Sequence, residues 1–385
     1  MDLTPLFKLM AEKQASDLFF SAGAPVYIKI EGQLHTVNRN PLDANTLKEA
    51  AYGLMTEAQI KEFEAELEMN LGVSVDGLGR FRVNVFRQRG SVAMVIRYIK
   101  HSVTPLEALC LPSVLQDLAL EKRGLVLVVG ATGSGKSTTL ASMVDYRNRN
   151  KSGHILTVED PIEFVHSHKK SIVNQREVGV DTASFGNALV NAMREAPDVL
   201  MIGEILDSET MRQALTYTQT GHLCLATLHA NNSYHALTRI LGFFPIDSRQ
   251  HLLHDLSVSL RGVISQRLVK GKDGKRLPAV EVLLNSLYIS DLIQKQEIDA
   301  IKEAMEQSMS EGSETFEQSL FNLYQSGQIS LEEALQNADS RNNLDWLIKN
   351  SGKPNNSGIK TEAVSSKPKA KGSFEDITIM PEMLD

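Results

Sequence analysis

The chain has 385 residues, with 40 Lys and Arg against 47 Asp and Glu and a formal net charge of −7. This length allows two or three domains, and a content of 42% hydrophobic and 23% charged residues is typical of a globular protein. The mild negative charge disfavours a protein that coats nucleic acid, so we expect no nucleic-acid partner. Its two cysteines, Cys110 and Cys224, lie far apart in the sequence, which excludes a disulfide framework and a four-cysteine zinc site.

Membrane and export signals are weak. No apolar run approaches the ~18 residues that a membrane-spanning helix needs, and the N-terminal residues 1–5 carry neither the basic nor the apolar region of a secretory signal. We therefore expect a cytoplasmic protein.

The first 100 residues alternate between helical and strand-like patterns. Apolar spacing predicts helices and strands in the order helix 3–13, strand 26–30, helices 44–55 and 56–67, and strands 80–85 and 92–99. This order predicts a small α+β domain over residues 1–100. Pro105 disfavours a helical conformation at Thr104, so residues 101–110 are predicted to be a linker.

From Gly124 onward, short β-branched runs alternate with helical stretches, which is the pattern of a parallel α/β sheet. The four apolar runs are 125–129, 154–158, 199–202 and 223–228, within a predicted core of residues 111–285. Residues 286–349 are predicted to be helical. The segment 350–385 is largely rich in Ser, Lys, Gly, Asn and Pro, and we expect it to be a disordered tail.

A glycine-rich segment follows the first of these apolar runs and opens a helix. It fits GxxxxGK[ST], and with the next residue it comprises Gly130, Ala131, Thr132, Gly133, Ser134, Gly135, Lys136, Ser137 and Thr138. In such a loop the backbone N–H groups and the helix N-terminus face phosphate oxygens. Lys136 is predicted to reach the β- and γ-phosphates of ATP, and Ser137 to hold Mg²⁺.

Polar residues end the other three apolar runs, where ligands bind in an open α/β sheet. Glu159, Asp160 and Glu163 follow the second run, Glu204 the third and His229 the fourth. Phosphoryl transfer to water needs a carboxylate for the nucleophile and oxygen ligands around Mg²⁺.

The roles of these carboxylates stay open at this level. Glu204 is assigned to the metal-bound or attacking water, with Glu159 and Glu163 as alternative bases; Glu163 is nearly as well explained as a solvated turn residue. His229 is predicted to bond the γ-phosphate. His222, before the fourth run, is either part of this site or structural.

Five arginines lie between residues 80 and 97, namely Arg80, Arg82, Arg87, Arg89 and Arg97. They form either a solvated sheet face or arginine fingers, which would bring positive charge to the γ-phosphate of a nucleotide. If they come from a neighbouring subunit, hydrolysis requires a ring.

Several longer segments resemble the secretion superfamily of ATPases and, within it, the type IV pilus retraction ATPases of the PilT/PilU family. They are SDL at 16–18, SAG at 21–23, GRFRVN at 79–84, GATGSGKSTTLA at 130–141, ILTVEDPIEFVH at 155–166, VNQREVG at 173–179 and TGHLCLATLHANN at 220–232. The stretch 159–163 resembles the family's Asp box, Gly203-Glu204 its Walker B motif, and His222 with His229 its His box.

This resemblance implies a PAS-like N-terminal domain, a RecA-like ATPase domain with a helical C-terminal part, and a homohexamer that hydrolyses ATP with Mg²⁺. It also implies arginine fingers, with Arg82, Arg89 and Arg97 as the candidates, and a place at the inner membrane beside a pilus platform protein.

Three features bear on the branch of the family. The chain lacks the longer N-terminal region and the tetracysteine site of pilus-assembly motors, which favours retraction. Residues 286–293 depart from the AIRNLIRE-like motif of PilT and, with the tail, resemble PilU, which implies a PilT-like ring as partner. Leu206 stands where the family usually has arginine, which puts normal turnover in question. The alternatives are an accessory ring with weak ATPase activity and a type II/IV secretion or DNA-transport ATPase.

Overall fold

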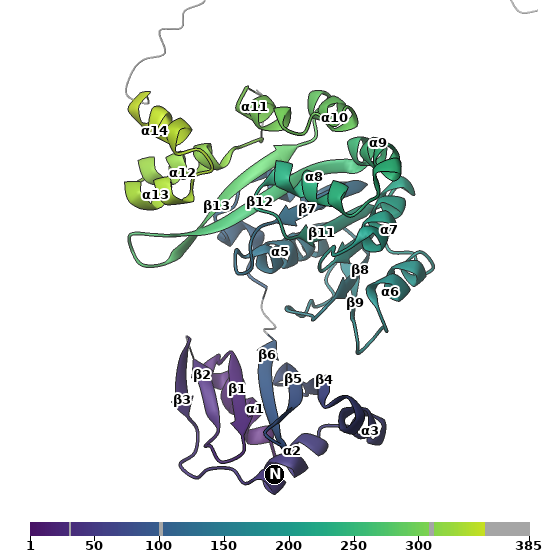
Figure 1. Cartoon of the computed structure of the whole chain (residues 1–385), viewed down its shortest axis with the longest axis vertical. Helices are drawn as coiled ribbons and strands as arrows, with labels where there is room; N and C mark the ends of the chain where they lie inside the picture. The colour runs from purple at the N-terminus through teal and green to yellow at the C-terminus, as the bar shows by residue number, and fades with distance from the viewer. Residues whose placement is uncertain (31, 100–102, 308–311, 351–385) are drawn as a thin grey trace, which may run out of the picture.

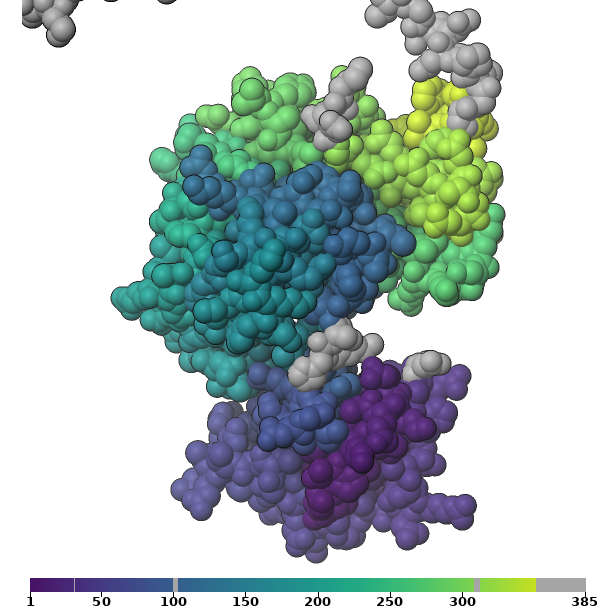
Figure 2. All heavy atoms as spheres, turned by 180° about the vertical axis from the view of Figure 1, so that it is seen from behind, coloured from purple at the N-terminus to yellow at the C-terminus, as the bar shows by residue number. Residues whose placement is uncertain are grey.

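The structure is a computed structural model that describes residues 1–30, 32–99, 103–307 and 312–350 (Figure 1). The tail predicted for residues 350–385 lies, from residue 351 on, outside the described residues. Within the described ranges, no helix combines the length and the apolar character that crossing a bilayer requires. Figure 2 shows the N-terminal residues as a lobe below the rest of the molecule, with the C-terminal helices packed at its upper end.

The N-terminal unit is an antiparallel sheet with helices packed on it. Within residues 1–30 and 32–99, six strands lie in the order β3-β2-β1-β6-β5-β4. The strands are β1 (Asp17–Ser21), β2 (Tyr27–Ile30), β3 (Gln33–Thr36), β4 (Glu68–Val75), β5 (Gly79–Gln88) and β6 (Ser91–Ile99), and the helices are α1 (Thr4–Lys13), α2 (Ala44–Tyr52) and α3 (Glu57–Glu66). Alternate residues of β5, such as Phe81, Val83 and Val85, are buried in the core of this unit. The expected α+β N-terminal unit is confirmed.

The C-terminal unit is built on a second sheet. Within residues 103–307 and 312–350, seven strands lie in the order β13-β12-β7-β11-β10-β8-β9, all neighbours parallel except β12 and β13. They are β7 (Gly124–Val129), β8 (Gly153–Glu159), β9 (Ser171–Glu177), β10 (Val199–Ile202), β11 (Leu223–Leu228), β12 (Leu260–Lys270) and β13 (Arg276–Leu284). The four predicted strands are β7, β8, β10 and β11, and they form the centre of the sheet.

Helices cover both faces of this sheet, because the strand residues alternate between the faces. Leu125, Leu127 and Val129 of β7 pack in a core with α6 to α11, whereas Val126 and Val128 pack with α4 and α5 on the other face. The helical elements are η1 (Leu106–Ala108), α4 (Val114–Leu120), α5 (Lys136–Asn150), α6 (Phe185–Ala192), α7 (Ser208–Gln219), α8 (Ser233–Gly242), η2 (Ile246–Ser248), α9 (Arg249–Ser259), α10 (Leu287–Gln294) and α11 (Ala300–Gln307).

The last helices form a small cluster on the β12–β13 hairpin. They are α12 (Phe316–Gln325), α13 (Leu331–Asn337) and α14 (Arg341–Asn350). Arg267 of β12 stacks on Phe316 with 3.9 Å between the guanidinium and the ring centroid, donates to the Asn337 carbonyl at 2.5 Å and pairs with Asp339. This arginine therefore holds the C-terminal helices on the sheet.

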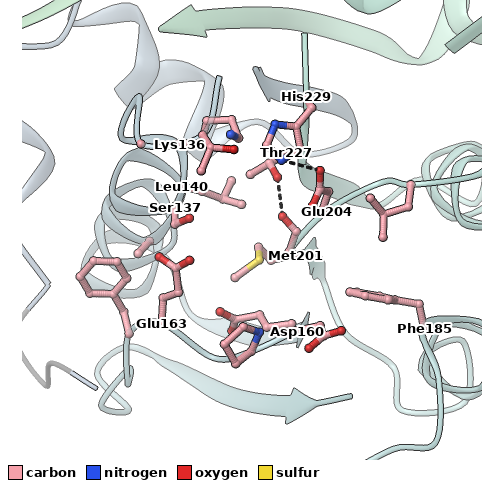
Figure 3. A pocket seen from close by; sticks show the side chains of 18 residues that line it. Lys136, Ser137, Leu140, Asp160, Glu163, Phe185, Met201, Glu204, Thr227 and His229 are labelled. Carbon is pink, nitrogen blue, oxygen red and sulfur yellow. Dashed lines mark hydrogen bonds and ion pairs between the residues drawn. The ribbon is translucent and has the colours of Figure 1, made fainter. Parts of the chain in front are cut away.

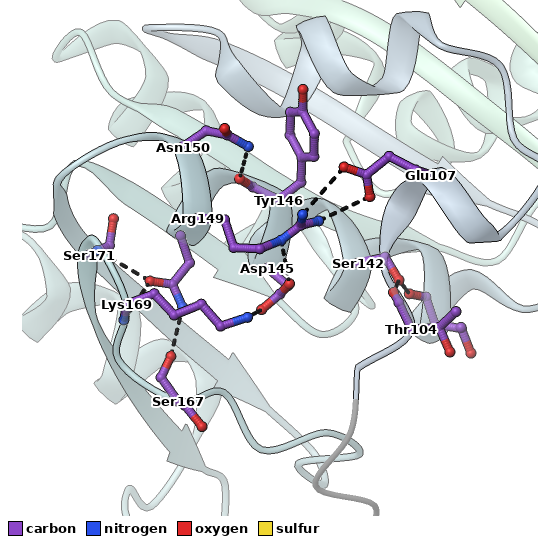
Figure 4. A network of polar contacts seen from close by, with 12 residues as sticks. Thr104, Glu107, Ser142, Asp145, Tyr146, Arg149, Asn150, Ser167, Lys169 and Ser171 are labelled. Atoms are coloured by element: carbon purple, nitrogen blue, oxygen red, sulfur yellow. Dashed lines mark hydrogen bonds and ion pairs between the residues drawn. The ribbon is translucent and has the colours of Figure 1, made fainter.

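The segment after the N-terminal unit is fastened to α5 (Figure 4). Ser142 donates to the Thr104 carbonyl at 2.7 Å, and Arg149 binds both carboxylate oxygens of Glu107 at 3.3 and 3.1 Å. Leu106 is buried in the core beside α5. From Thr104 onward, the segment predicted as a linker thus packs on the helix that begins with the phosphate-loop lysine.

Candidate active site

The glycine-rich loop joins β7 to α5 and is shaped for a ligand. Gly133 and Gly135 have φ values of +79° and +94°, where residues with a Cβ are strained. A Cβ on Gly130 would lie 2.3 Å from the Ser134 hydroxyl and 2.5 Å from the Gln266 carbonyl oxygen. The Ser134 hydroxyl is buried without a hydrogen-bond partner among the described residues. These features are those of a phosphate cradle.

The loop opens into a cleft of about 350 Å³ at the carboxyl ends of the central strands (Figure 3). Eighteen residues line it: Thr132, Gly133, Lys136, Ser137, Leu140, Ala141, Glu159, Asp160, Pro161, Glu163, Phe164, Phe185, Met201, Gly203, Glu204, Leu206, Thr227 and His229. The residues predicted at the strand ends therefore do converge on the phosphate loop. Gly130, Ala131, Ser134 and Gly135 belong to the loop behind this opening, and Thr138 continues α5 outside the lining.

Lys136 is held inside the loop that it serves. Its Nζ donates to the carbonyl oxygens of Gly130 and Ala131 at 3.0 and 3.1 Å. Burial lowers the pKa of Lys136, and the carboxylates of Glu204 and Glu163 oppose this shift by favouring its charged form. The cleft thus combines one buried cation with two nearby carboxylates.

Glu204 is paired with His229 across the ends of β10 and β11. The distance between Glu204 Oε1 and His229 Nε2 is 2.9 Å, and Figure 3 shows this contact on the wall of the cleft. Thr227 Oγ1 donates to the Gly203 carbonyl at 2.5 Å, which ties the two strand ends together. The pair therefore lines the same cleft as Lys136 and Ser137 of the phosphate loop.

Glu159 differs from the other two glutamates because it is buried. Its Oε1 accepts from Thr157 Oγ1 at 2.6 Å and from Gln175 Nε2 at 3.2 Å. Burial raises the pKa of Glu159 from 4.5 to about 7, a shift that these hydrogen bonds only partly offset. Glu163, in contrast, is exposed and has its carboxylate in the cleft.

Other predicted site residues lie away from this cleft within the chain. Arg82 and Arg97 are cross-strand neighbours on β5 and β6, and Arg97 Nε binds Asp17 at 2.8 Å. Arg89 lies in the turn that joins β5 to β6, outside both strands.

His222 is also distant from the cleft. It precedes β11, at the end of the strand opposite to His229, and its ring packs on Tyr217 with 4.9 Å between the centroids. Its Nδ1 lies 3.0 Å from the Thr220 hydroxyl oxygen. These contacts favour the structural alternative for His222.

Two further residues lie near the site: Gln266 carried no sequence signal of its own, and Arg80 was one of the five arginines of the N-terminal unit but was not among the three chosen candidates. Gln266, on β12, accepts from Thr139 Oγ1 at 2.7 Å, and its carbonyl supports the loop beneath Gly130. Arg80 reaches from β5 to Glu177 at the end of β9, with 3.3 Å between Nη2 and Oε2. Gln266 is recognisable only once β12 is placed beside β7.

Comparison with known proteins now identifies the family. The family described as Type II/IV secretion system protein matches residues 2–353. The chain belongs to this family. It is 49% identical to the type IV pilus ATPase PilU of Pseudomonas aeruginosa over 350 residues, which cover 91% of this chain and 92% of PilU. It is 42% identical to the pilus retraction ATPase PilT of the same organism, covering 88% of this chain and 98% of PilT.

A solved structure agrees with this assignment to the family. The crystal structure of the pilus retraction motor PilT with bound ADP superposes with a TM-score of 0.83 at 40% identity, and the match covers 90% of this chain and 99% of that one. The PilT/PilU family and the two-unit α/β fold are confirmed, and the chain is a nucleotide-using ATPase. The cleft at the phosphate loop is its candidate active site.

Proposed function

We propose that six copies of the chain form an ATP-hydrolysing ring that drives retraction of a type IV pilus. The observation that carries this proposal is the cleft in which Lys136, Ser137, Glu163, Glu204 and His229 converge, in a chain that matches PilU and PilT over nearly their whole lengths. The ring is a homohexamer on the cytoplasmic face of the inner membrane. It acts together with a PilT-like ring and contacts a pilus platform protein.

The phosphate loop binds the nucleotide through its backbone N–H groups. Lys136 leaves the carbonyl oxygens of Gly130 and Ala131 and turns to the β- and γ-phosphates, whose negative charge adds to that of Glu204 and Glu163 around the buried ammonium group. The orphaned Ser134 hydroxyl gains a phosphate oxygen as its acceptor.

Ser137 and, through water, Glu204 would hold Mg²⁺ together with the phosphates. A hydroxyl and a carboxylate are oxygen ligands of the kind that this ion prefers, and it is usually bound by few protein groups plus substrate phosphates. In keeping with this, the described ranges contain no group of three His, Cys, Asp or Glu side chains arranged as a metal cage. When bound, the ion would neutralise charge on the β- and γ-phosphates.

Glu163 takes the proton of the attacking water. Among the three glutamates, Glu159 is buried under two side-chain hydrogen bonds and Glu204 is engaged by His229, whereas Glu163 has its carboxylate exposed to the cleft. His229 orients Glu204 and bonds the γ-phosphate. Arg82, Arg89 and Arg97 act from a neighbouring subunit, since none of them lines the cleft of its own chain.

A second candidate function, an accessory ring with little ATPase activity of its own, is favoured by one observation. Leu206, which is 54% exposed, lines the cleft where the family usually has arginine. Such a ring would bind ATP and add force only in the company of PilT.

Steady-state ATP hydrolysis by the purified protein decides between the two. The motor predicts turnover that falls by at least ~100-fold on Lys136→Ala and on Glu163→Gln, with no change on Glu303→Gln, a surface carboxylate of α11. Negligible turnover of the unaltered protein, with ATP still bound, would instead establish the accessory ring. Full activity in Glu163→Gln would remove Glu163 from the mechanism.

A further inference from the structure

The N-terminal unit and the ATPase unit, which holds the cleft, are joined by a charged contact. Arg80, near the start of β5, places Nη2 3.3 Å from Oε2 of Glu177 and 3.9 Å from Oδ2 of Asp181. Among the residues that the structure describes, these are the ion pairs that join the N-terminal unit to the ATPase unit. The Arg80 side chain is 20% exposed and that of Glu177 only 5%, so the pair is shielded from water on the carboxylate side.

The local structure of the N-terminal unit makes room for this arginine. Gly72 of β4 lies beside Arg80, and a Cβ on Gly72 would be 3.0 Å from Nη2 and 3.3 Å from Nε. The guanidinium therefore lies across the neighbouring strand at a position without a side chain. Its Nε is buried and has no hydrogen-bond partner in the described part of the chain.

The same oxygen of Glu177 also contacts the loop of residues 160–163, which carries the proposed base. Glu177 Oε2 accepts a hydrogen bond from the backbone N–H of Ile162 at 3.3 Å. Ile162 is buried and directly precedes Glu163. A movement of the Glu177 carboxylate is thus passed to the backbone that carries the proposed base.

We propose that Arg80 is a positioning residue through which the orientation of the N-terminal unit sets the position of Glu163. While Arg80 is in place, Glu177 has its cation and holds the Ile162 N–H. When the N-terminal unit rotates and withdraws Arg80, the buried carboxylate loses its charge partner and must shift toward water, and the loop of residues 160–163 shifts with it. Hydrolysis is then fastest in one orientation of the two units.

The covalent connection supports this coupling. Because Thr104 and Glu107 are bound to α5 (Figure 4), the chain beyond Thr104 moves with the ATPase unit. When the N-terminal unit changes its orientation, the contact that changes is therefore that of Arg80, whereas the contacts of Thr104 and Glu107 with α5 stay the same. The inference rests on the proposed role of Glu163.

A double-mutant cycle on the full-length protein tests the coupling. Arg80→Gln and Glu177→Gln are each expected to lower kcat about tenfold, with an unchanged dissociation constant for a fluorescent ADP analogue, and the double variant should be no slower than either single one. Arg80→Lys should recover much of the rate. Arg87→Gln is the matched control, because Arg87 lies on the same strand but pairs with Glu64 inside the N-terminal unit at 2.6 Å.

The cycle also separates this role from the alternatives. If Arg80 contacted only the phosphates bound to a neighbouring subunit, the losses in kcat from Arg80→Gln and Glu177→Gln would add in the double variant. If Arg80 contributed only to folding, Arg80→Gln would change kcat no more than Arg87→Gln does. Either result would overturn the proposal. Failure of the base assignment is seen separately, as retained activity in Glu163→Gln.

Discussion

The buried carboxyl group of Glu159 makes the stability of the ATPase unit depend on pH. Its pKa in the folded protein is about 7, against 4.5 for an ordinary glutamate. Between these two values the unfolded chain releases the proton and the folded chain keeps it, so stability falls by about 1.4 kcal/mol for each pH unit. Above pH 7 both states are ionised, and the accumulated loss is about 3 kcal/mol.

Glu159→Gln removes this loss because the amide does not ionise and its oxygen still accepts from Thr157 and Gln175. The variant is expected to exceed the parent by less than about 1 kcal/mol near pH 5 and by up to about 3 kcal/mol at pH 8. For a unit of this size that is a rise in Tm of roughly 6 to 12 °C.

Thermal unfolding of nucleotide-free protein between pH 5 and 8.5 measures the difference in Tm between variant and parent. Glu62→Gln, at an exposed position of α3, is the control and should leave Tm unchanged at every pH. A difference for Glu159→Gln that is the same at pH 5 and pH 8, or that has the opposite sign at pH 8, would refute the reasoning.

Other substitutions probe the loop, the C-terminal helices and the rim of the cleft. Gly130→Ala should abolish nucleotide binding in an equilibrium titration, because its Cβ would lie 2.3 Å from the Ser134 hydroxyl; Gly133→Ala, which meets open space, should weaken binding only about tenfold through its positive φ. Arg267→Ala should raise the rate of proteolysis within α12–α14 about tenfold or more while β7–β11 stay protected, because the contacts that hold these helices on β12 are lost. Leu206→Arg should lower KM for ATP several-fold without lowering Tm, since the new charge lies at an exposed position on the cleft; an unchanged KM would show that this position does not meet the nucleotide.

The central strands and the convergence of their ends could be predicted because their residues are buried on both faces. All positions of β7, β10 and β11 are buried, which gives continuous apolar runs in the sequence. Strand β3 is exposed throughout, and β9 at the sheet edge reads Asn174-Gln175-Arg176-Glu177 in its second half. Such strands form through hydrogen bonds to a neighbour, so hydrophobic periodicity does not reveal them.

The sequence could not show which arginine of the N-terminal unit contacts the ATPase unit, and the reason is geometric. Residues i and i+2 of a strand share a face, so Arg80 and Arg82 are equivalent by alternation, and only the position of the second unit shows that Arg80 is the one at the boundary. Arg89 carries the same charge at the other end of the hairpin, nine residues from Arg80 and roughly 30 Å away along the strand. His222 and His229 are separated in the same way, by the length of β11.

The position of Glu204 two residues beyond the end of β10, after Gly203, has a steric explanation. A Cβ at position 203 would lie 3.1 Å from the Glu159 Cα and 3.3 Å from the Val158 carbonyl oxygen, because the ends of β10 and β8 approach closely there. A side chain at position 203 would therefore press on the backbone of β8. Gly203 fills that position, its N–H and C=O bind Val158 and Thr227, and the next residue turns its carboxylate toward His229 and the cleft. The close packing of β8 and β10 thus explains why glycine follows β10 and why the acidic residue of this motif comes one position later. At that position the Glu204 carboxylate lines the cleft.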